Sequence, residues 1–326
     1  MADTAAPITP IEPARWRPWE FVFWTLAFGA FWMFPTRLLL LNEVAILALF
    51  ALSLDLVLGY AGIVSLGHVA FFGLGAYTAG ILAKFVIADP FVGLLAGAAM
   101  AGLLGFVSSF LLLRGSDLTR LMVTLGVAMM MLELANKMAW LTGGSDGLQG
   151  VVMKPVLGTF DFDLYGKTAY GYSLGVLFLC FLGARRLVHS PFGRSLLAIK
   201  TNLLRARAIG VPSTWRLVAV YTIAAAMAGI AGTLSLQTAQ FASLDILAFH
   251  RSADVLLVLI IGGAGYLYGG LIGALGFKVM QNWLSAITPK YWLFWLGLIL
   301  VALVLVGRDR IAGGVPALWR RLRARP

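Results

Sequence analysis

Charged residues are scarce in this chain. Only 12% of its 326 residues are Asp, Glu, Lys or Arg, and 60% are hydrophobic. Soluble domains are about 25% charged and at most about half apolar. A single soluble core cannot bury such a surplus of apolar side chains, which excludes an ordinary soluble protein. The composition therefore predicts an all-α, polytopic membrane protein.

Motifs that carry chemistry are also missing. The chain has one cysteine, Cys180, so no disulfide can form within it. It contains no GxxxxGK[ST] phosphate loop, no HExxH motif and no GxSxG motif, and its three histidines lie far apart. We therefore expect no catalytic residues, no metal site and no cofactor bound by this chain. Transport is favoured over catalysis.

Basic residues outnumber acidic residues, and they are unevenly distributed along the chain. The chain has 25 Lys and Arg against 14 Asp and Glu, a formal net charge of +11. Most basic residues lie in short connections between apolar spans, as the positive-inside rule produces, so no nucleic-acid partner is predicted. Residues 185–216 carry basic residues and no acidic one. This segment, the arm 1–18 and the basic tail 308–326 are thus predicted to be cytoplasmic, and loop 142–170 external.

Apolar stretches of the ~20 residues that cross a bilayer recur along the chain. They predict one transmembrane domain over residues 19–307, with about ten helices, or about eight if two segments only half cross. Both termini are then on the cytoplasmic side. The expected spans lie near residues 20–41, 44–60, 69–88, 91–113, 118–140, 170–188, 216–240, 252–265, 268–286 and 291–307.

One amphipathic helix is predicted within the cytoplasmic segment 187–215. Ser190 suits the N-cap, Pro191 the first helical position and Gly210 the C-terminal stop. An apolar face recurs every three or four residues, formed by Phe192, Leu196, Ile199, Leu203 and Ala206. Basic side chains occupy the other side: Arg194, Lys200, Arg205 and Arg207. The pattern fits a helix that couples to a separate ATPase subunit, and equally a helix resting on anionic membrane lipid.

Two glycine-rich breaks interrupt apolar spans in opposite halves of the chain. The segments 59–68 and 262–270 share a Gly-x-Ala-Gly core. Such paired breaks indicate a pathway in the membrane, since a broken helix exposes backbone only where it lines a cavity. Close helix packing is the alternative, which the isolated pattern favours. The candidate pathway residues are Gly59, Gly62, Ser65, Gly67, His68, Gly262, Gly263 and Gly265.

Three acidic residues fall within apolar spans: Asp55, Glu133 and Asp254. A carboxylate near the bilayer centre costs ~2.5–3.5 kcal/mol, so each is expected to face a cavity or a partner. Glu133 has Lys137 four residues later, which favours a structural ion pair. Whether Asp55 and Asp254 are structural or functional stays open. No serial relay of acids is visible, which disfavours proton coupling.

A turn is predicted where the external loop begins. The run from Thr142 to Gly147 supplies glycines for positive φ and an aspartate for a local hydrogen bond. The functional alternative places this turn at the external entrance or under a docking partner. Its residues would then be Gly143, Gly144, Ser145 and Asp146.

Five stretches together resemble the permease subunits of branched-chain amino-acid ABC importers, specifically the LivM-like branch. They occur in family order, and the resemblance runs from about residue 41 to residue 307. The stretches are residues 58–78, 142–148, 190–194 with 206–210, 228–232, and 261–265. Arg205 departs from the family pattern, where a small residue is usual, so the contact with an ATPase is expected to be more basic here.

The resemblance implies a permease that carries branched-chain amino acids, or similar small polar solutes such as amides, urea and aromatic acids, across a bacterial inner membrane. It implies three kinds of partner chain: a second homologous permease, two ATP-binding subunits that hold ATP and Mg, and a periplasmic solute-binding protein. It assigns ATPase coupling to Arg194, Lys200, Arg205, Ala206, Arg207 and Gly210. An ion-coupled secondary transporter is the alternative.

Overall fold

The structure, a computed structural model, describes residues 16–113, 115, 117–163, 165–291, 294–299 and 301. Within these residues the chain is all-α, with two isolated β-bridges and no strand, which confirms the predicted fold class. Most of the arm 1–18 and the whole basic tail 308–326 lie outside the described residues.

Helices follow the predicted spans closely. Their bounds are α1 Pro18–Met33, α2 Leu38–Asp55, α3 Val69–Phe85, α4 Pro90–Leu112, α5 Asp117–Lys137, α6 Ala139–Thr142, α7 Lys167–His189, α8 Pro191–Thr201, α9 Leu203–Ala208, α10 Ser213–Ala239, α11 Phe249–Gly262 and α12 Leu267–Ile287. A π-helical turn, η1 Leu56–Tyr60, extends α2, and two 3₁₀ turns are η2 Gly144–Asp146 and η3 Leu244–Leu247.

Five helices in the described part of the chain are long and apolar enough to cross a membrane: α2 with η1, α4, α5, α7 and α10. The α11–α12 pair, bent by 112° at its break, makes six if it counts as one span. Helix α3 is apolar but shorter. The predicted span 291–307 lies largely outside the described residues, so the predicted number of crossings stays a prediction.

One predicted boundary is wrong. Helix α1 ends at Met33 and α2 begins at Leu38, whereas the sequence suggested one span over 20–41 and the next from residue 44. Pro35 explains the earlier break, because a proline disfavours helical backbone at the residue before it and lacks an N–H of its own. Residues 38–41 therefore belong to the second helix.

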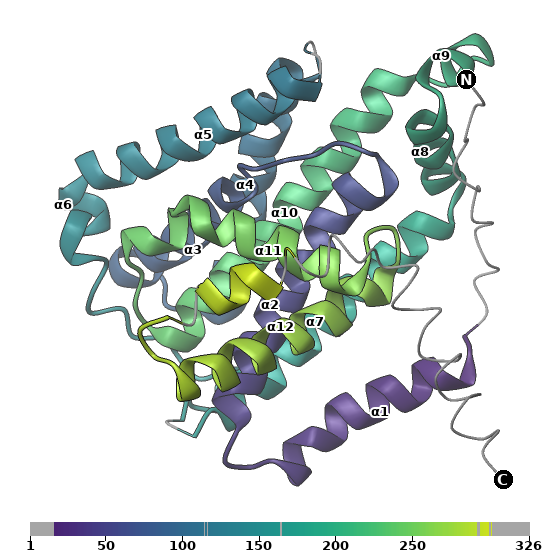
Figure 1. The fold of residues 1–326 in the computed structure, drawn as a ribbon. Helices are drawn as coiled ribbons and strands as arrows, with labels where there is room; N and C mark the ends of the chain where they lie inside the picture. The colour runs from purple at the N-terminus through teal and green to yellow at the C-terminus, as the bar shows by residue number, and fades with distance from the viewer. Residues whose placement is uncertain are drawn as a thin grey trace, which may run out of the picture.

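Helix α2 runs through the centre of the bundle, against α7, α10, α11 and α12 (Figure 1). Helix α10 packs closely along α3 and α4, because glycines let the backbones approach. A Cβ added at Gly75 would collide with Gly229, and one added at Gly232 would collide with the Phe72 carbonyl. Helices α1 and α5 lie at the edge of the molecule (Figure 1).

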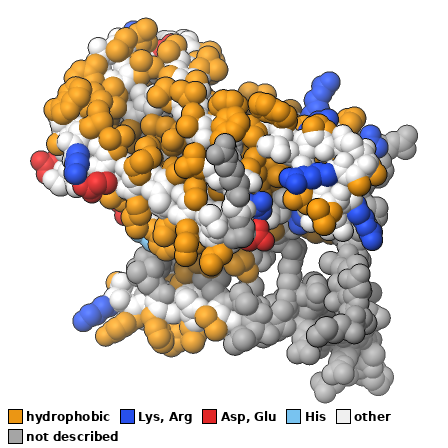
Figure 2. All heavy atoms as spheres, turned by 90° about the horizontal axis from the view of Figure 1, so that it is seen from above, with side chains coloured by type: hydrophobic (Ala, Val, Ile, Leu, Met, Phe, Trp, Pro, Cys, Tyr) orange, Lys and Arg blue, Asp and Glu red, His pale blue; other side chains and the backbone are white. Residues whose placement is uncertain are grey.

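Apolar side chains also cover the outside of the bundle. Figure 2 shows hydrophobic side chains spread over most of one face, with Lys and Arg gathered toward the side where α8 and α9 lie in Figure 1. Leu95 is 74% exposed and Leu111 is 62% exposed. An apolar surface of this extent suits contact with lipid.

Candidate functional site

The predicted amphipathic helix is two helices in the structure, α8 and α9, which we call the α8–α9 segment. A single helix over residues 190–210 is therefore wrong. The chain is extended at Asn202, with φ −157° and ψ 102°, and the Asn202 side chain caps α9 by accepting a hydrogen bond from the Arg205 N–H at 2.9 Å. Asparagine is a strong N-cap, so it begins a second helix where the apolar period alone would continue the first.

Other features of the segment are confirmed. The Ser190 hydroxyl accepts a hydrogen bond from the Gly193 N–H, Pro191 begins α8, and Gly210 has φ +84° after α9. Leu196, Ile199 and Ala206 are buried as the apolar face requires. The predicted coupling residues Arg194, Arg205, Arg207 and Gly210 are exposed, and only Ala206 among them is covered.

Lys200 connects the α8–α9 segment to the first glycine break. Its ammonium donates a hydrogen bond of 2.6 Å to the carbonyl of Gly59. Gly59 lies in the π-helical turn η1, where the backbone ladder is widened and a carbonyl is free to bond elsewhere. The Lys200 ammonium therefore reaches the bundle although the residue as a whole is exposed, and its role in ATPase coupling stays a prediction.

The two glycine breaks meet at the same place. The backbone N–H of Gly265 donates to Asp55 Oδ1 at 2.7 Å. A Cβ at Gly59 would collide with both Asp55 and Gly265, so only glycine fits there. Gly265 itself has φ +84°, which side chains other than glycine rarely adopt. We call Asp55, Gly59, Lys200 and Gly265 the junction.

The remaining pathway candidates near the first break pack tightly. A Cβ at Gly67 would collide with the Thr124 carbonyl. His68 is fully buried, with its Nε2 at 3.0 Å from the Ser53 hydroxyl and its ring stacked on Phe50 at 5.7 Å between centroids. Ser65 is fully buried as well.

Glycines 62, 262 and 263 complete the set of pathway candidates. Gly62 has φ +74° and lies against the Lys200 side chain, where an added Cβ would be 2.9 Å from Lys200 Cγ. Gly262 ends α11 so close to Gly269 of α12 that a Cβ would collide with the Gly269 carbonyl. Gly263 follows with φ +94°. The structure thus shows close packing at these positions, and their role in a pathway stays a prediction.

A cavity of about 720 Å³, which we call the large cavity, lies beside the half of α2 that does not carry the junction. Its lining runs from Leu39 to Phe50 on α2, so it lies toward the end of this helix that is remote from the junction. Ionisable side chains from three helices line it: Glu43, His250, Arg251, Asp254 and Lys278. None of the predicted pathway glycines lines this cavity.

The three acids of the apolar spans have different surroundings. Asp55 is buried and bonded to Gly265 in the junction. Glu133 pairs with Lys137 at 3.8 Å on an exposed face of α5, which confirms the expected i,i+4 pair. Asp254 faces the large cavity. An acid in a span is therefore partnered or beside a cavity in each case, as the cost of burying a charge requires.

The turn at the start of the external loop has the expected geometry. Gly143 and Gly144 have φ +80° and +55°, and the Thr142 hydroxyl donates to the Met138 carbonyl at 2.9 Å. Ser145 and Asp146 are exposed in the 3₁₀ turn η2. Just after the turn, Leu148 pairs with Ala242 in a β-bridge, which ties this loop to the segment before α11. The proposed entrance role stays a prediction.

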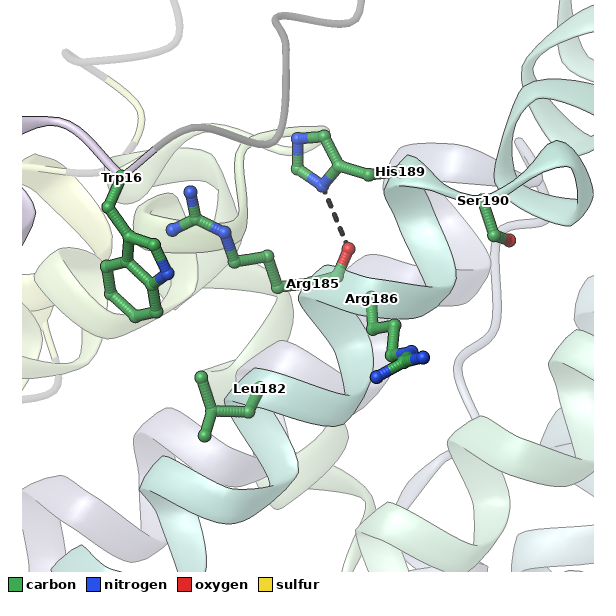
Figure 3. A pocket seen from close by; sticks show the side chains of 6 residues that line it. All are labelled: Trp16, Leu182, Arg185, Arg186, His189 and Ser190. Atoms are coloured by element: carbon green, nitrogen blue, oxygen red, sulfur yellow. Dashed lines mark hydrogen bonds between the residues drawn. The ribbon is translucent and has the colours of Figure 1, made fainter.

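A second hollow, of about 560 Å³, lies at the end of α7 (Figure 3). The Arg185 guanidinium forms an ion pair with the buried Glu20 of α1 and lies 4.2 Å from the centroid of the Trp16 ring. His189 Nδ1 bonds the Arg185 carbonyl at 2.8 Å, as the dashed line in Figure 3 shows. The Arg185–Glu20 ion pair fastens α1 to α7, which is a structural role.

Comparison with known proteins places the sequence in a family. The family described as "Branched-chain amino acid transport system / permease component" matches residues 36–304, most of the chain. The chain belongs to this family. The permease component is a transport subunit and not an enzyme, which confirms that expectation. No solved structure matches the chain.

Individual relatives agree with the family. The permease is 29% identical over 283 residues to the high-affinity branched-chain amino acid transport system permease protein LivM of Salmonella typhimurium, and equally to LivM of Escherichia coli. The match covers 78% of this chain and 64% of each LivM, so the chain spans less than two thirds of their length. The ribose import permease protein RbsC of Bacillus subtilis is 30% identical over 171 residues, 48% of this chain and 52% of its own.

Sequence reasoning missed the charged lining of the permease's large cavity. Lys278 lies inside the predicted span 268–286, and Glu43 stands just before the span predicted from residue 44. A lysine in the middle of an apolar span is itself a signal for a cavity or a partner. The pair joins at 2.8 Å across 235 residues of sequence, a contact that no local pattern contains.

Proposed function

We propose that this chain is a transmembrane permease subunit of an ABC importer, which carries branched-chain amino acids or similar small polar solutes into the cytoplasm. The observation that carries the proposal is the bond between Lys200 and Gly59. It links a segment exposed at one end of the bundle to the place where the two glycine breaks meet. Family membership makes that segment the expected contact for an ATP-binding partner.

The surface of α9 supports docking to a protein. Leu204 and Ile209 are each 77% exposed, and they flank the basic side chains of Arg205 and Arg207. Exposed apolar anchors rimmed by charge are typical of protein interfaces. The proposed partners are two ATP-binding subunits, which would hold the ATP and Mg, a second related permease and a periplasmic solute-binding protein.

The proposed mechanism is alternating access driven from the ATPase subunits. ATP binding closes these subunits, and the closure displaces the α8–α9 segment. Lys200 transmits the displacement to the Gly59 carbonyl, and the junction then changes its packing. Glycine-rich turns suit such a movement, because positive-φ turns absorb backbone rotation without a side chain to obstruct it. The solute released by the binding protein passes inward.

A pull-down of the detergent-solubilised permease, expressed with its native gene neighbours, tests the proposal. We expect an ATP-hydrolysing subunit to co-purify, and we expect Arg205→Glu and Leu204→Asp to abolish co-purification. Val152→Asp is the matched control, since Val152 is 70% exposed in the loop 142–170 at the other end of the bundle. Purification of the permease alone, with solute uptake driven by an ion gradient, would favour the secondary transporter instead.

A further inference from the structure

The large cavity is lined by charges of both signs on one side. Lys278 of α12 pairs with Glu43 of α2 at 2.8 Å. Arg251 of α11 pairs with Asp245 at 2.8 Å. Asp254 follows Arg251 by one helical turn, lines the cavity, and forms no hydrogen bond or ion pair with any described residue. A basic group and an open carboxylate thus lie on the same wall.

Two polar side chains that line the cavity, Lys278 and Asn42, have hydrogen-bonding atoms that no described residue satisfies. An ammonium carries three donors, and the bond with Glu43 uses one donor of Lys278. Asn42 is only 5% exposed and lines the cavity, yet its Oδ1 has no hydrogen-bond partner among the described residues. Buried polar atoms without partners are rare, and one beside a cavity is available to accept a hydrogen bond from a ligand there.

The cavity also has an apolar, aromatic lining. Phe50, Phe72 and Phe277 contribute to it, and the rings of Phe50 and Phe72 lie 4.8 Å apart. Phe50 also stacks on His68 of the first glycine break. A side chain seated against these rings would therefore contact a ring that rests on the break. A cavity of this size, apolar with a few convergent polar groups, is typical of a small-molecule site.

We propose that this cavity is a binding site for an α-amino acid zwitterion with an aliphatic side chain. The substrate carboxylate bonds Lys278, its ammonium bonds Asp254 and the Asn42 carbonyl oxygen, and its side chain lies against Phe50, Phe72 and Phe277. The assignment rests on the proposed import function for its physiological meaning, and it names the side chains that would hold the substrate.

Charge complementarity separates this substrate from a sugar. A neutral ribose offers neither an ammonium to the Asp254 carboxylate nor a carboxylate to the remaining donors of Lys278, so it forms a charge-assisted bond with neither group. A zwitterion forms both bonds at once. The same reasoning disfavours urea, which carries no charge and has no side chain for the aromatic lining.

Photo-cross-linking tests the site directly. The probe is photo-leucine, the diazirine analogue of leucine, added to the importer purified with its partners in nanodiscs made of anionic phosphatidylglycerol, so that no zwitterionic headgroup can occupy the cavity. We expect labelled peptides from α2 and α12, displaced by excess unlabelled leucine and not by ribose. Labelling confined to other segments, or labelling that leucine fails to displace, would overturn the assignment.

Variants extend the test to uptake. Asp254→Asn removes the open carboxylate, and the double variant Glu43→Gln/Lys278→Gln removes a pair of opposite charges together, so that neither partner is left unpaired in a folded chain. Loss of one charged hydrogen bond predicts about ten- to hundredfold weaker labelling and uptake. The control is Glu133→Gln/Lys137→Gln, which removes the exposed pair on α5 and keeps both signals.

The two proposals fail in different ways. Wild-type uptake that needs ATP, together with full labelling and uptake in the Asp254 and Glu43/Lys278 variants, would overturn the binding site and leave the importer intact. Labelling of the cavity without ATP-dependent uptake would support the site and overturn the importer. Assembly of each variant, followed by gel filtration with the ATPase subunits, shows that any loss does not come from misfolding.

Discussion

Lys200 joins two parts of the permease that lie 141 residues apart in the sequence. Its stem packs over Gly62 while its ammonium reaches the Gly59 carbonyl. A long flexible side chain that buries its stem and donates at its tip is suited to connect a moving surface helix to a backbone group. The bond is charge-assisted, so it is stronger than an ordinary backbone hydrogen bond.

Replacement of this lysine is expected to uncouple the segment from the junction. In Lys200→Met the stem still covers Gly62, but the Gly59 carbonyl loses its donor. A charged hydrogen bond is worth about 1.5–3 kcal/mol, so we expect solute uptake to fall about tenfold or more while the complex still assembles. Uptake assays in proteoliposomes measure this. Lys154→Met, in the loop 142–170, is the control, and equal uptake in the two variants would refute the linkage.

Glycines in the junction and beside it should not tolerate side chains. Gly62 and Gly265 have φ of +74° and +84°, which cost an L-residue about 1–2 kcal/mol. We expect Gly62→Val and Gly265→Val to abolish uptake and to leave co-purification with the ATPase unchanged. Gly126→Ala is the control, because nothing lies within 4 Å of a Cβ there. Loss of assembly in the valine variants would instead support a packing role alone.

At the scale of the element, the α8–α9 segment shows which helix boundaries the local sequence predicts and which it does not. Ser190, Pro191 and Gly210 predicted its ends, since caps depend on the residues beside them. The break at Asn202 was missed, because an apolar face that repeats every three or four residues continues through it. Capping preference and periodicity compete at such a position, and the cap prevails here.

The sequence could not predict contacts between distant elements, for a different reason. Shared Gly-x-Ala-Gly cores suggested that the two breaks correspond, but not that Gly265 would bond Asp55. Likewise, the spacing within α5 revealed Glu133 and Lys137, whereas Glu43 and Lys278 meet only through the packing of α2 on α12. Periodicity reports which face of a helix is apolar, and tertiary packing decides what that face meets.

The break between α8 and α9 is expected to matter for docking. Asn202→Ala removes the cap of α9, which costs about 1 kcal/mol of local helix stability. We expect α9 to fray and the permease to bind its ATPase subunits more weakly in a titrated pull-down. Asn202→Asp keeps an oxygen that accepts the Arg205 N–H, so it should retain wild-type affinity. Equal weakening in both variants would point to a contact made by Asn202 itself.

At the scale of the whole molecule, two features lie along the central helix α2. The basic α8–α9 segment contacts one end of it through the junction, and the large cavity lies beside the other half. The junction lies where η1 extends α2, and the cavity lines α2 from Leu39 to Phe50. The positive-inside rule predicts that the α8–α9 segment is cytoplasmic. With that orientation, the half of α2 that lines the cavity lies nearer the external side of the membrane.

Orientation can be measured with single cysteines. Cys180 is the one cysteine of the chain, so Cys180→Ala provides a clean background. We expect Ser145→Cys to react with a membrane-impermeant maleimide in intact spheroplasts, and Thr201→Cys to react only after permeabilisation, since the two residues lie at opposite ends of the bundle. The reverse pattern would invert the assigned topology.

The most direct test of ATP-driven import is leucine uptake by the reconstituted complex. Proteoliposomes would contain the permease with its co-purified partners, with ATP present on the side of the ATPase subunits. We predict uptake that requires ATP hydrolysis, persists when ionophores abolish proton and sodium gradients, and falls about tenfold or more in Lys200→Met. Uptake by the permease alone, driven by an ion gradient and indifferent to ATP, would contradict import by an ABC transporter.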